Sequence, residues 1–201
     1  MGRLSETSWS ALAPSAATSG SPPFVLSATC SGSTAAMLSF LCLLQKLMHN
    51  RGAAHVHEAI DASLKKSGLD YIDQYLVHGP EGGPEMRADV WKGCCEAKDG
   101  GKVRSIGVSN FGVRHLEQLF ASEPKYIPTV NQVDLHPFMT RNELVAFCEK
   151  HDIVLEAWAP LVRGLRFDHP VVVELANKYS KTPAQVLIRW GLDRVRSLLP
   201  C

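Results

Sequence analysis

Several patterns that would assign a function class are missing from this sequence of 201 residues. The six cysteines include no CxxC pair, so neither a zinc framework nor a secreted disulfide framework is indicated. We therefore expect free thiols, a reducing cytoplasmic location and no metal site. The longest mostly apolar run, residues 35–44, is shorter than the roughly 18 residues that span a bilayer. No membrane association is expected.

The charges also exclude a class of partner. Lys and Arg number 21 and Asp and Glu number 20, for a net charge of +1, and the basic residues are scattered singly. Without a basic stripe and interleaved aromatic residues, we expect no nucleic-acid partner. No strand-like segment is followed by GxGxxG, so the dinucleotide fingerprint of doubly wound sheets is absent as well.

The composition changes near residue 50. The opening stretch "MGRLSETSWSALAPSAATSGSPPF" is rich in Ser, Ala, Pro and Gly and has almost no charge. We expect residues 1–50 to form a poorly ordered segment and residues 51–201 to form the folded domain. A core role or a targeting role for residues 35–44 stays open, and so does a mis-joined gene model as the source of residues 1–50.

From residue 51 the sequence alternates between helical and strand patterns. Val56, Ile60 and Leu64 follow helical spacing, and Gly68 is a typical helix end. Capping-box patterns start two later helices, Thr140 with Glu143 and Thr182 with Gln185. The strands are expected in the stretches "LDYIDQYLVHGP", "VRSIGVSN", "TVNQVDLHP", "IVLEAWAP" and "SLLP". Such alternation predicts an α/β fold with parallel strands and helical crossovers, and a barrel is favoured.

Polar or aromatic residues stand where four successive strands end. They are His78, then Ser109 and Asn110, then Gln132, then Trp158. A barrel gathers the carboxyl ends of its strands around one mouth, where its sites lie. Amide and hydroxyl groups can bind an amide-bearing ligand, and an indole can stack on a flat ring. Taken singly, each residue also has an ordinary structural explanation, as a turn residue or as part of the core.

Five stretches together resemble the aldo-keto reductases, NADP-dependent oxidoreductases built on a TIM barrel. They are "GLDYIDQYLVHGP", "GKVRSIGVSNF", "PTVNQVDLHP", "LEAWAPLVRG" and "KTPAQVLIRWGL". The resemblance implies a partial (β/α)8 barrel, about strands 4 to 8 with their helices. It also implies NADP(H) as cofactor and a small carbonyl compound as substrate. The oligomeric state is left open.

The resemblance assigns roles to individual residues. His78 would be catalytic and would orient the substrate carbonyl for hydride attack. Ser109, Asn110 and Gln132 would hold the nicotinamide carboxamide, and Trp158 would stack on the ring. The loop with Leu161, Arg163 and Gly164 would run past the pyrophosphate.

The family's catalytic set is Asp, Tyr, Lys and His, and only the His is expected in this chain. Lys46 stands in no family-like context, and no Asp or Tyr precedes Asp61. If His78 faces the barrel, Tyr71 and Tyr75 face the helices, because side chains alternate along a strand. The downstream Lys-Ser of the family is also missing, so the chain is expected to be truncated at both ends.

Two hypotheses about the function follow from these observations. One is a reductase of aldehydes or ketones that uses NADPH. The alternative is an inactive, truncated relative that at most binds a nucleotide or a partner chain.

Overall fold

The computed structural model describes residues 44–195 and 197–199, and within them six strands form one parallel sheet. The strands follow one another in sequence order across the sheet. They are β1 (Leu44–Leu47), β2 (Ile72–Val77), β3 (Val103–Ser109), β4 (Val130–Asp134), β5 (Val154–Trp158) and β6 (Ser197–Leu199). The prediction of a parallel α/β fold is confirmed, with one strand more than the five expected.

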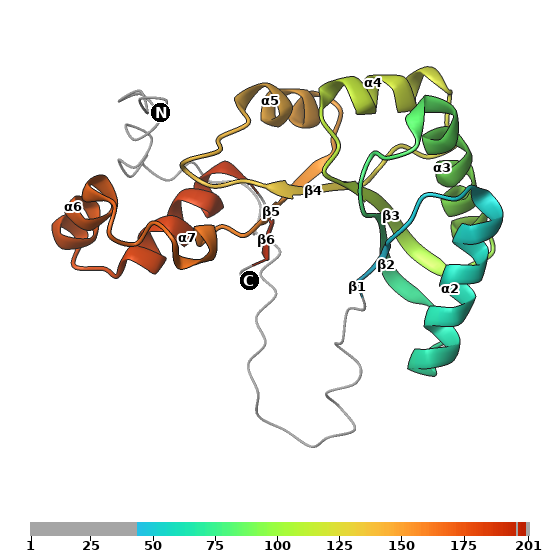
Figure 1. The fold of residues 1–201 in the computed structure, drawn as a ribbon, viewed down its shortest axis with the longest axis horizontal. Coiled ribbons are helices and arrows are strands. Elements are labelled where there is room, and N and C mark those ends of the chain that lie inside the picture. The colour runs from blue at the N-terminus through green and yellow to red at the C-terminus, as the bar shows by residue number, and fades with distance from the viewer. Residues whose placement is uncertain (1–43, 196, 200–201) are drawn as a thin grey trace, which may run out of the picture.

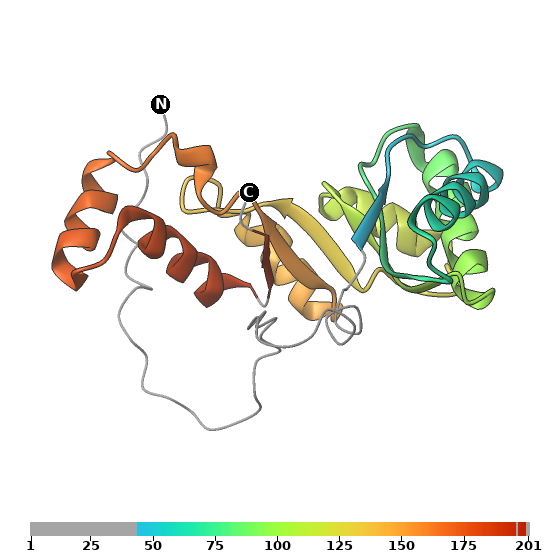
Figure 2. The ribbon, with the colours of Figure 1, turned by 90° about the horizontal axis from the view of Figure 1, so that it is seen from below.

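Helices connect the strands. They are α2 (Ala53–Ser67), α3 (Gly83–Asp99), α4 (Val113–Ala121), α5 (Asn142–Lys150), the 3₁₀ turn η4 (Val162–Gly164), α6 (Pro170–Tyr179) and α7 (Pro183–Arg194). In Figure 1, α2 to α5 lie along one side of the sheet, and Figure 2 shows the strands of this open arc side by side. Parallel neighbours in sequence order, each linked by a helix, are the arrangement of a (β/α) barrel, so the described residues form part of one.

The strand β1 was not expected as part of the domain. We placed the domain start at residue 51, but Leu44 to Leu47 pair in register with Gln74 to Val77 of β2. The sheet therefore begins inside the segment that the composition marked as poorly ordered. The rest of that segment, residues 1–43, lies outside the described residues.

The helix boundaries partly follow the sequence signals. Gly68 ends α2 in the left-handed conformation and donates to the Leu64 carbonyl over 2.9 Å, as expected. Thr182 and Gln185 form the predicted reciprocal cap of α7. The cap expected from Thr140 is wrong, because Arg141 occupies the N-cap position of α5 at a φ of 44° and no side chain in the described ranges caps this helix.

The core lies between the sheet and the helices. One face of each strand turns toward the helices and is mostly apolar, with Tyr75, Ile106, Val133 and Leu155 among the buried residues. The glycine at position 107 faces the other way. A Cβ there would come within 2.7 Å of both the Val130 carbonyl oxygen and a Leu76 methyl carbon. The strand β3 can pass this close to its neighbours only with glycine at that place.

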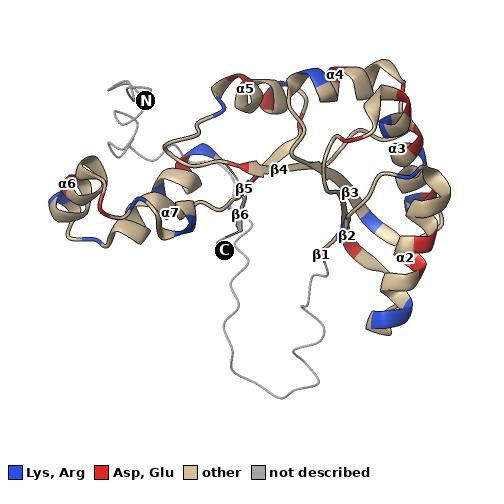
Figure 3. Ribbon diagram, in the orientation of Figure 1, with Lys and Arg blue, Asp and Glu red and all other residues tan. Residues whose placement is uncertain are grey.

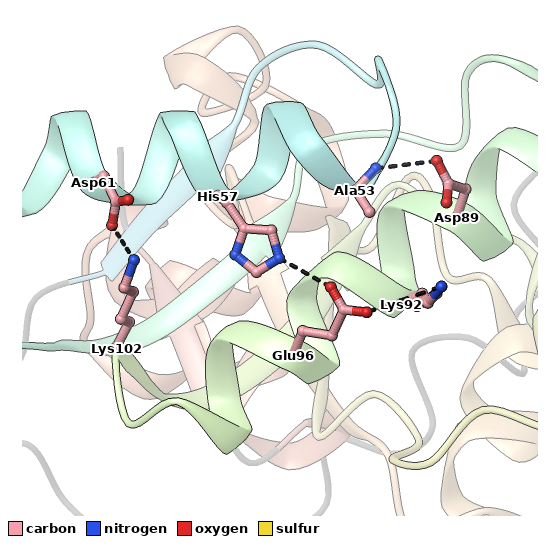
Figure 4. Close-up of polar contacts among 7 residues, drawn as sticks. All are labelled: Ala53, His57, Asp61, Asp89, Lys92, Glu96 and Lys102. Atoms are coloured by element: carbon pink, nitrogen blue, oxygen red, sulfur yellow. Dashed lines mark hydrogen bonds and ion pairs between the residues drawn. The ribbon is translucent and has the colours of Figure 1, made fainter.

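The helices α2 and α3 pack closely at Gly93, where an added Cβ would lie 2.8 Å from the Cα of Ala53. Polar pairs surround this contact (Figure 4): Asp89 accepts from the Ala53 amide over 3.0 Å, and His57 pairs with Glu96 at 3.0 Å. Elsewhere, charges of both signs are spread over the helices (Figure 3). Among the described residues no helix is long and apolar enough to cross a membrane.

Candidate functional site

A row of three polar side chains crosses the face of the sheet that is turned away from the helices, which we call the inner face. Ser109 of β3 is in register with Gln132 of β4, and Gln132 is in register with Glu156 of β5. Residues in register on parallel strands point to the same face. All three are buried, with exposed fractions of 2%, 1% and 7%. The sheet register alone therefore assembles a polar layer from three strands.

The members of this row are bonded to each other. The Ser109 hydroxyl donates to the backbone carbonyl of Gln132 over 2.9 Å. The side-chain amide nitrogen of Gln132 donates to the Glu156 carboxylate. The Gln132 amide oxygen accepts from the Lys46 ammonium group. Since buried polar groups need such partners, the network holds the Gln132 amide in one orientation, with a cation on one side and an anion on the other.

Lys46, like Glu156, belongs to this network but is not among the site residues that the sequence predicts. The sequence around Lys46 does not resemble the family, yet β1 presents this lysine on the inner face, in register with Leu76. Its ammonium nitrogen also lies 4.9 Å from the centre of the Trp158 ring, within the range of a cation–π interaction. A four-residue strand after an apolar run is a weak signal, and only its pairing with β2 shows which way Lys46 points.

Asn110 directly follows β3 and has the left-handed conformation, with a φ of 61°. Asn tolerates this backbone better than most residues do, because its short side chain bonds locally. Its amide nitrogen donates to the His78 carbonyl over 3.0 Å and to the Ser109 hydroxyl over 3.3 Å. The amide oxygen has no hydrogen-bond partner among the described residues, and Asn110 is exposed, so this oxygen can accept from a ligand.

His78 directly follows β2 and is half-buried. Its backbone amide donates to the Leu47 carbonyl over 3.1 Å, which continues the β1–β2 pairing by one residue. Within the part of the chain that the structure describes, the imidazole makes no hydrogen bond. The ring is therefore held by its backbone and remains available to a ligand at the mouth.

The loop after β5 carries the three residues predicted near the pyrophosphate: Leu161, Arg163 and Gly164. Arg163 and Gly164 lie in η4 and are exposed, and Leu161 is the N-cap residue of this turn. Non-glycine residues rarely adopt a positive φ, yet Val162 and Arg163 have φ values of 54° and 52°. Backbone strain of this kind gathers at ligand-binding sites more often than elsewhere.

None of the four tyrosines of this chain lies on the inner face. Tyr75 points to α3, where burial and the neighbouring Cys94 thiol raise its pKa, so it stays protonated. Tyr71 packs under the Arg104 guanidinium at 3.6 Å, Tyr126 donates to Asp99 over 2.8 Å, and Tyr179 ends α6. The expectation that Tyr75 faces the helices is confirmed.

Other features of the described residues lie apart from this site. A cavity of about 420 Å³ between α5, β5 and α7 is lined by Cys148, Ile153 and Val195 at the amino end of β5, opposite the mouth. No three His, Cys, Asp or Glu side chains in the described ranges are grouped so as to hold a metal ion.

Comparison with known proteins agrees with this geometry. A model of the Aldo/keto reductase family matches residues 42–201. The chain belongs to the aldo/keto reductase family. The match begins just before β1, which places the Lys46 strand inside the family domain.

Similar proteins support the same assignment. An uncharacterized oxidoreductase of Schizosaccharomyces pombe is 43% identical over 152 residues, which cover 76% of this chain and 53% of that protein. The methylglyoxal reductase DkgA of Escherichia coli O157:H7 is 44% identical over 154 residues, covering 76% and 54%. The chain thus spans about half the length of these relatives.

Solved structures show the fold directly. An aldo/keto reductase from Brucella melitensis superposes with a TM-score of 0.75 and 37% identity, covering 81% of this chain and 62% of that structure. The apo form of Gox0644 gives a TM-score of 0.74 at 35% identity, covering 80% and 59%. The described sheet therefore corresponds to part of an aldo/keto reductase barrel.

Proposed function

We propose that this aldo/keto reductase chain binds NADP(H) on the inner face of its sheet and serves the reduction of small aldehydes or ketones to alcohols in the cytoplasm. The observation that carries the proposal is the bonded set of Lys46, Gln132 and Glu156 beside Trp158. Polar groups are buried at a cost unless they are hydrogen-bonded, and here the bonds hold them in a fixed orientation. This set lies at the carboxyl ends of parallel strands, where barrel enzymes bind their ligands.

The donors and acceptors fit a nicotinamide. The exposed Asn110 amide oxygen can accept from the carboxamide nitrogen, and the second hydrogen of the Gln132 amide can reach its oxygen. Trp158 is half-buried and offers a flat indole face. We assign Leu161, Arg163 and Gly164 to the pyrophosphate, since Arg163 is exposed and cationic.

Two residues of this chain are suited to act on the carbonyl. When bound, the reduced nicotinamide supplies the hydride that attacks the carbonyl carbon. His78 can donate a hydrogen bond to the carbonyl oxygen and orient the substrate. Lys46, which we assign to the lysine of the family's catalytic set, places a cation where negative charge develops on that oxygen. Glu156 holds this lysine indirectly, because both contact the Gln132 amide.

A second candidate function is cofactor binding without turnover. Its basis is that no tyrosine of the 201 residues lies on the inner face, so the family's usual proton donor has no counterpart there. Such a chain would bind a nucleotide, or a partner chain, through the same residues. The two candidates share the binding site and differ only in the chemical step.

One titration tests the binding proposal. NADPH is added to the full chain while tryptophan emission is recorded, and the same titration is run on Trp158→Phe. Quenching that is lost in the variant supports the site, because Trp9, Trp91 and Trp190 remain as internal controls. Unchanged quenching in the variant, or none in the wild-type chain, contradicts it.

Activity is then measured as NADPH oxidation with methylglyoxal, the substrate in the names of several relatives. Turnover that falls at least about 100-fold in Lys46→Met and in His78→Gln, with binding retained, supports the reductase, since one donor at a developing charge is worth that much. Binding without any turnover in the wild-type chain selects the second candidate.

A further inference from the structure

The loop that carries His78 is fixed by side chains from outside it. Four consecutive backbone carbonyls, those of residues 78–81, each accept a side-chain hydrogen bond. The bonds are Asn110 Nδ2 to His78 O (3.0 Å), Asn50 Nδ2 to Gly79 O (2.9 Å), Arg87 Nη1 to Pro80 O (2.7 Å) and Asn50 Nδ2 to Glu81 O (3.0 Å). Loop carbonyls usually face water, so an unbroken run of protein donors is unusual for a surface turn.

The donors surround the loop from different elements. Asn50 follows β1, Asn110 follows β3, and Arg87 lies on the helix α3 that the loop leads into. The strands β1 and β3 are the two neighbours of β2 in the sheet. The loop is therefore attached to both neighbouring strands and to its own helix, and His78 at its first position has little freedom to move.

Arg87 is the least expected of these donors. Its side chain is 7% exposed, and in the described residues no carboxylate pairs with it. One end of the guanidinium donates to Pro80, and the other donates to the Gln118 side chain on α4. Its Nε atom is buried and has no hydrogen-bond partner among the described residues. Burying a charge without a counter-ion is costly, so the fold keeps this one at the expense of stability.

Asn50 is suited to its place in another way. A single amide nitrogen carries two hydrogens, and here it donates to two carbonyls that are two residues apart. The carboxamide thus spans the turn of the loop. An aspartate of the same size would have no hydrogen to donate and would set negative charge against both carbonyl oxygens.

We propose that Asn50 and Arg87 are positioning residues for His78. They hold the loop of residues 78–81 so that the imidazole points toward the inner face at the carboxyl ends of the strands. The inference rests on the proposed function for the role of His78 itself. It adds two residues, neither of which touches the inner face, to the set on which that role depends.

The test uses the full chain and three variants. Asn50→Asp removes both donors without changing the size of the side chain. Arg87→Lys keeps the charge but replaces the planar fork with a point donor. Asn177→Asp makes the same chemical change on the exposed surface of α6 and is the matched control.

Two NMR readouts report on the loop and on the ring. We expect the amides of Gly79 and Glu81 to show order parameters near about 0.85 in the wild-type chain and below about 0.6 in Asn50→Asp. The His78 ring signal should shift or broaden in Asn50→Asp and Arg87→Lys, while the ring signal of His57 stays unchanged. A merely structural defect would move both histidines together.

The outcomes separate the two proposals. If the loop amides and the His78 ring are the same in wild-type and Asn50→Asp chains, the positioning role is wrong, whatever Arg87→Lys does. If both change while NADPH fails to quench Trp158 in the wild-type chain, the positioning role stands and the proposed function fails. Should Arg87→Lys not fold, Asn50→Asp decides alone.

Discussion

The two faces of the sheet differ in what they bury, and the difference separates stability from chemistry. The face toward the helices buries apolar side chains, among them Ile106 and Leu155. The inner face buries Ser109, Gln132 and Glu156 on the same strands. A strand can serve both purposes because its side chains alternate, so that β2 turns Tyr75 to the helices and Leu76 to the inner face. Burial of apolar side chains on the face toward the helices stabilises the fold, whereas burial of polar side chains on the inner face lowers its stability.

The largest effect should come from the apolar layer. Leu116 on α4 is 0% exposed, and Leu116→Ala should lower the free energy of unfolding by about 2–5 kcal/mol, because the deletion leaves a cavity. Urea unfolding measures the loss. The same change at Leu192, which is 51% exposed on α7, should stay within about 0.5 kcal/mol. Equal losses of unfolding free energy at both sites would show that the apolar residues between the sheet and the helices do not form the core.

The apolar layer should also set the response to alkaline pH. Burial raises the pKa of the Cys148 thiol from 9.0 to about 11, against a smaller opposing effect of the Asn131 hydrogen bond. Between these values the folded chain retains a proton that the unfolded chain loses. Stability should therefore fall as pH rises, by about 2–3 kcal/mol from this thiol across the window.

Urea unfolding at pH 8, 9, 10 and 11 measures this slope, and Cys148→Ala removes the contribution of the thiol. Burial also raises the pKa of Cys94, so part of the slope should remain in the variant. A slope that is identical in both chains would place Cys148 in contact with water.

On the inner face the cost of a deletion should be smaller and should fall on binding as well. Glu156→Ala leaves the Gln132 amide without its acceptor and takes away the anion beside the Lys46–Gln132 pair. We expect a loss of about 1–3 kcal/mol in stability. In addition, NADPH binding should weaken, because the Gln132 amide is no longer held.

Glu174→Ala, on the exposed surface of α6, is the matched control and should change neither quantity. Calorimetry and the Trp158 titration measure the two effects. A variant at position 156 that binds NADPH as tightly as the wild-type chain would remove Glu156 from the site.

The sequence was sufficient for the outer face and most of the strand order. Helical spacing with Val56 and Ile60, the glycine at position 68 and the Thr182 cap are local signals, and each appears in the structure as expected. The Thr140 cap failed because Arg141 adopts a left-handed conformation and donates to the Asp134 carbonyl over 2.7 Å. That bond joins the loop to the end of β4 and could not be read locally.

The inner face was less accessible to sequence reasoning. The strand ends pointed to His78, Asn110 and Gln132, but not to their partners. Glu156 and Lys46 join the set only through the register of β4 with β5 and of β1 with β2. No sequence pattern indicates Asn50 or Arg87, because these residues bond to the backbone carbonyls of a single loop. Contacts of this kind depend on tertiary placement and not on residue spacing.

The smallest effect should come from the outer surface of the helix layer. His57 pairs with Glu96 between α2 and α3, with Lys92 at 3.9 Å from the same carboxylate (Figure 4). The side chains of both partners of the His57 pair are partly exposed, at 35% and 46%. Exposed ion pairs contribute about 0–1 kcal/mol and are screened by salt. Glu96→Gln should therefore lower the free energy of unfolding by less than about 1 kcal/mol.

A double-mutant cycle with His57→Gln isolates the coupling between the two residues. We expect the coupling to be small and to shrink when the salt concentration is raised, because the pair is partly exposed. A coupling as large as the loss at Leu116 would contradict the comparison between the layers. It would mean that α2 is held on α3 by charge, and that the close approach at Gly93 contributes little.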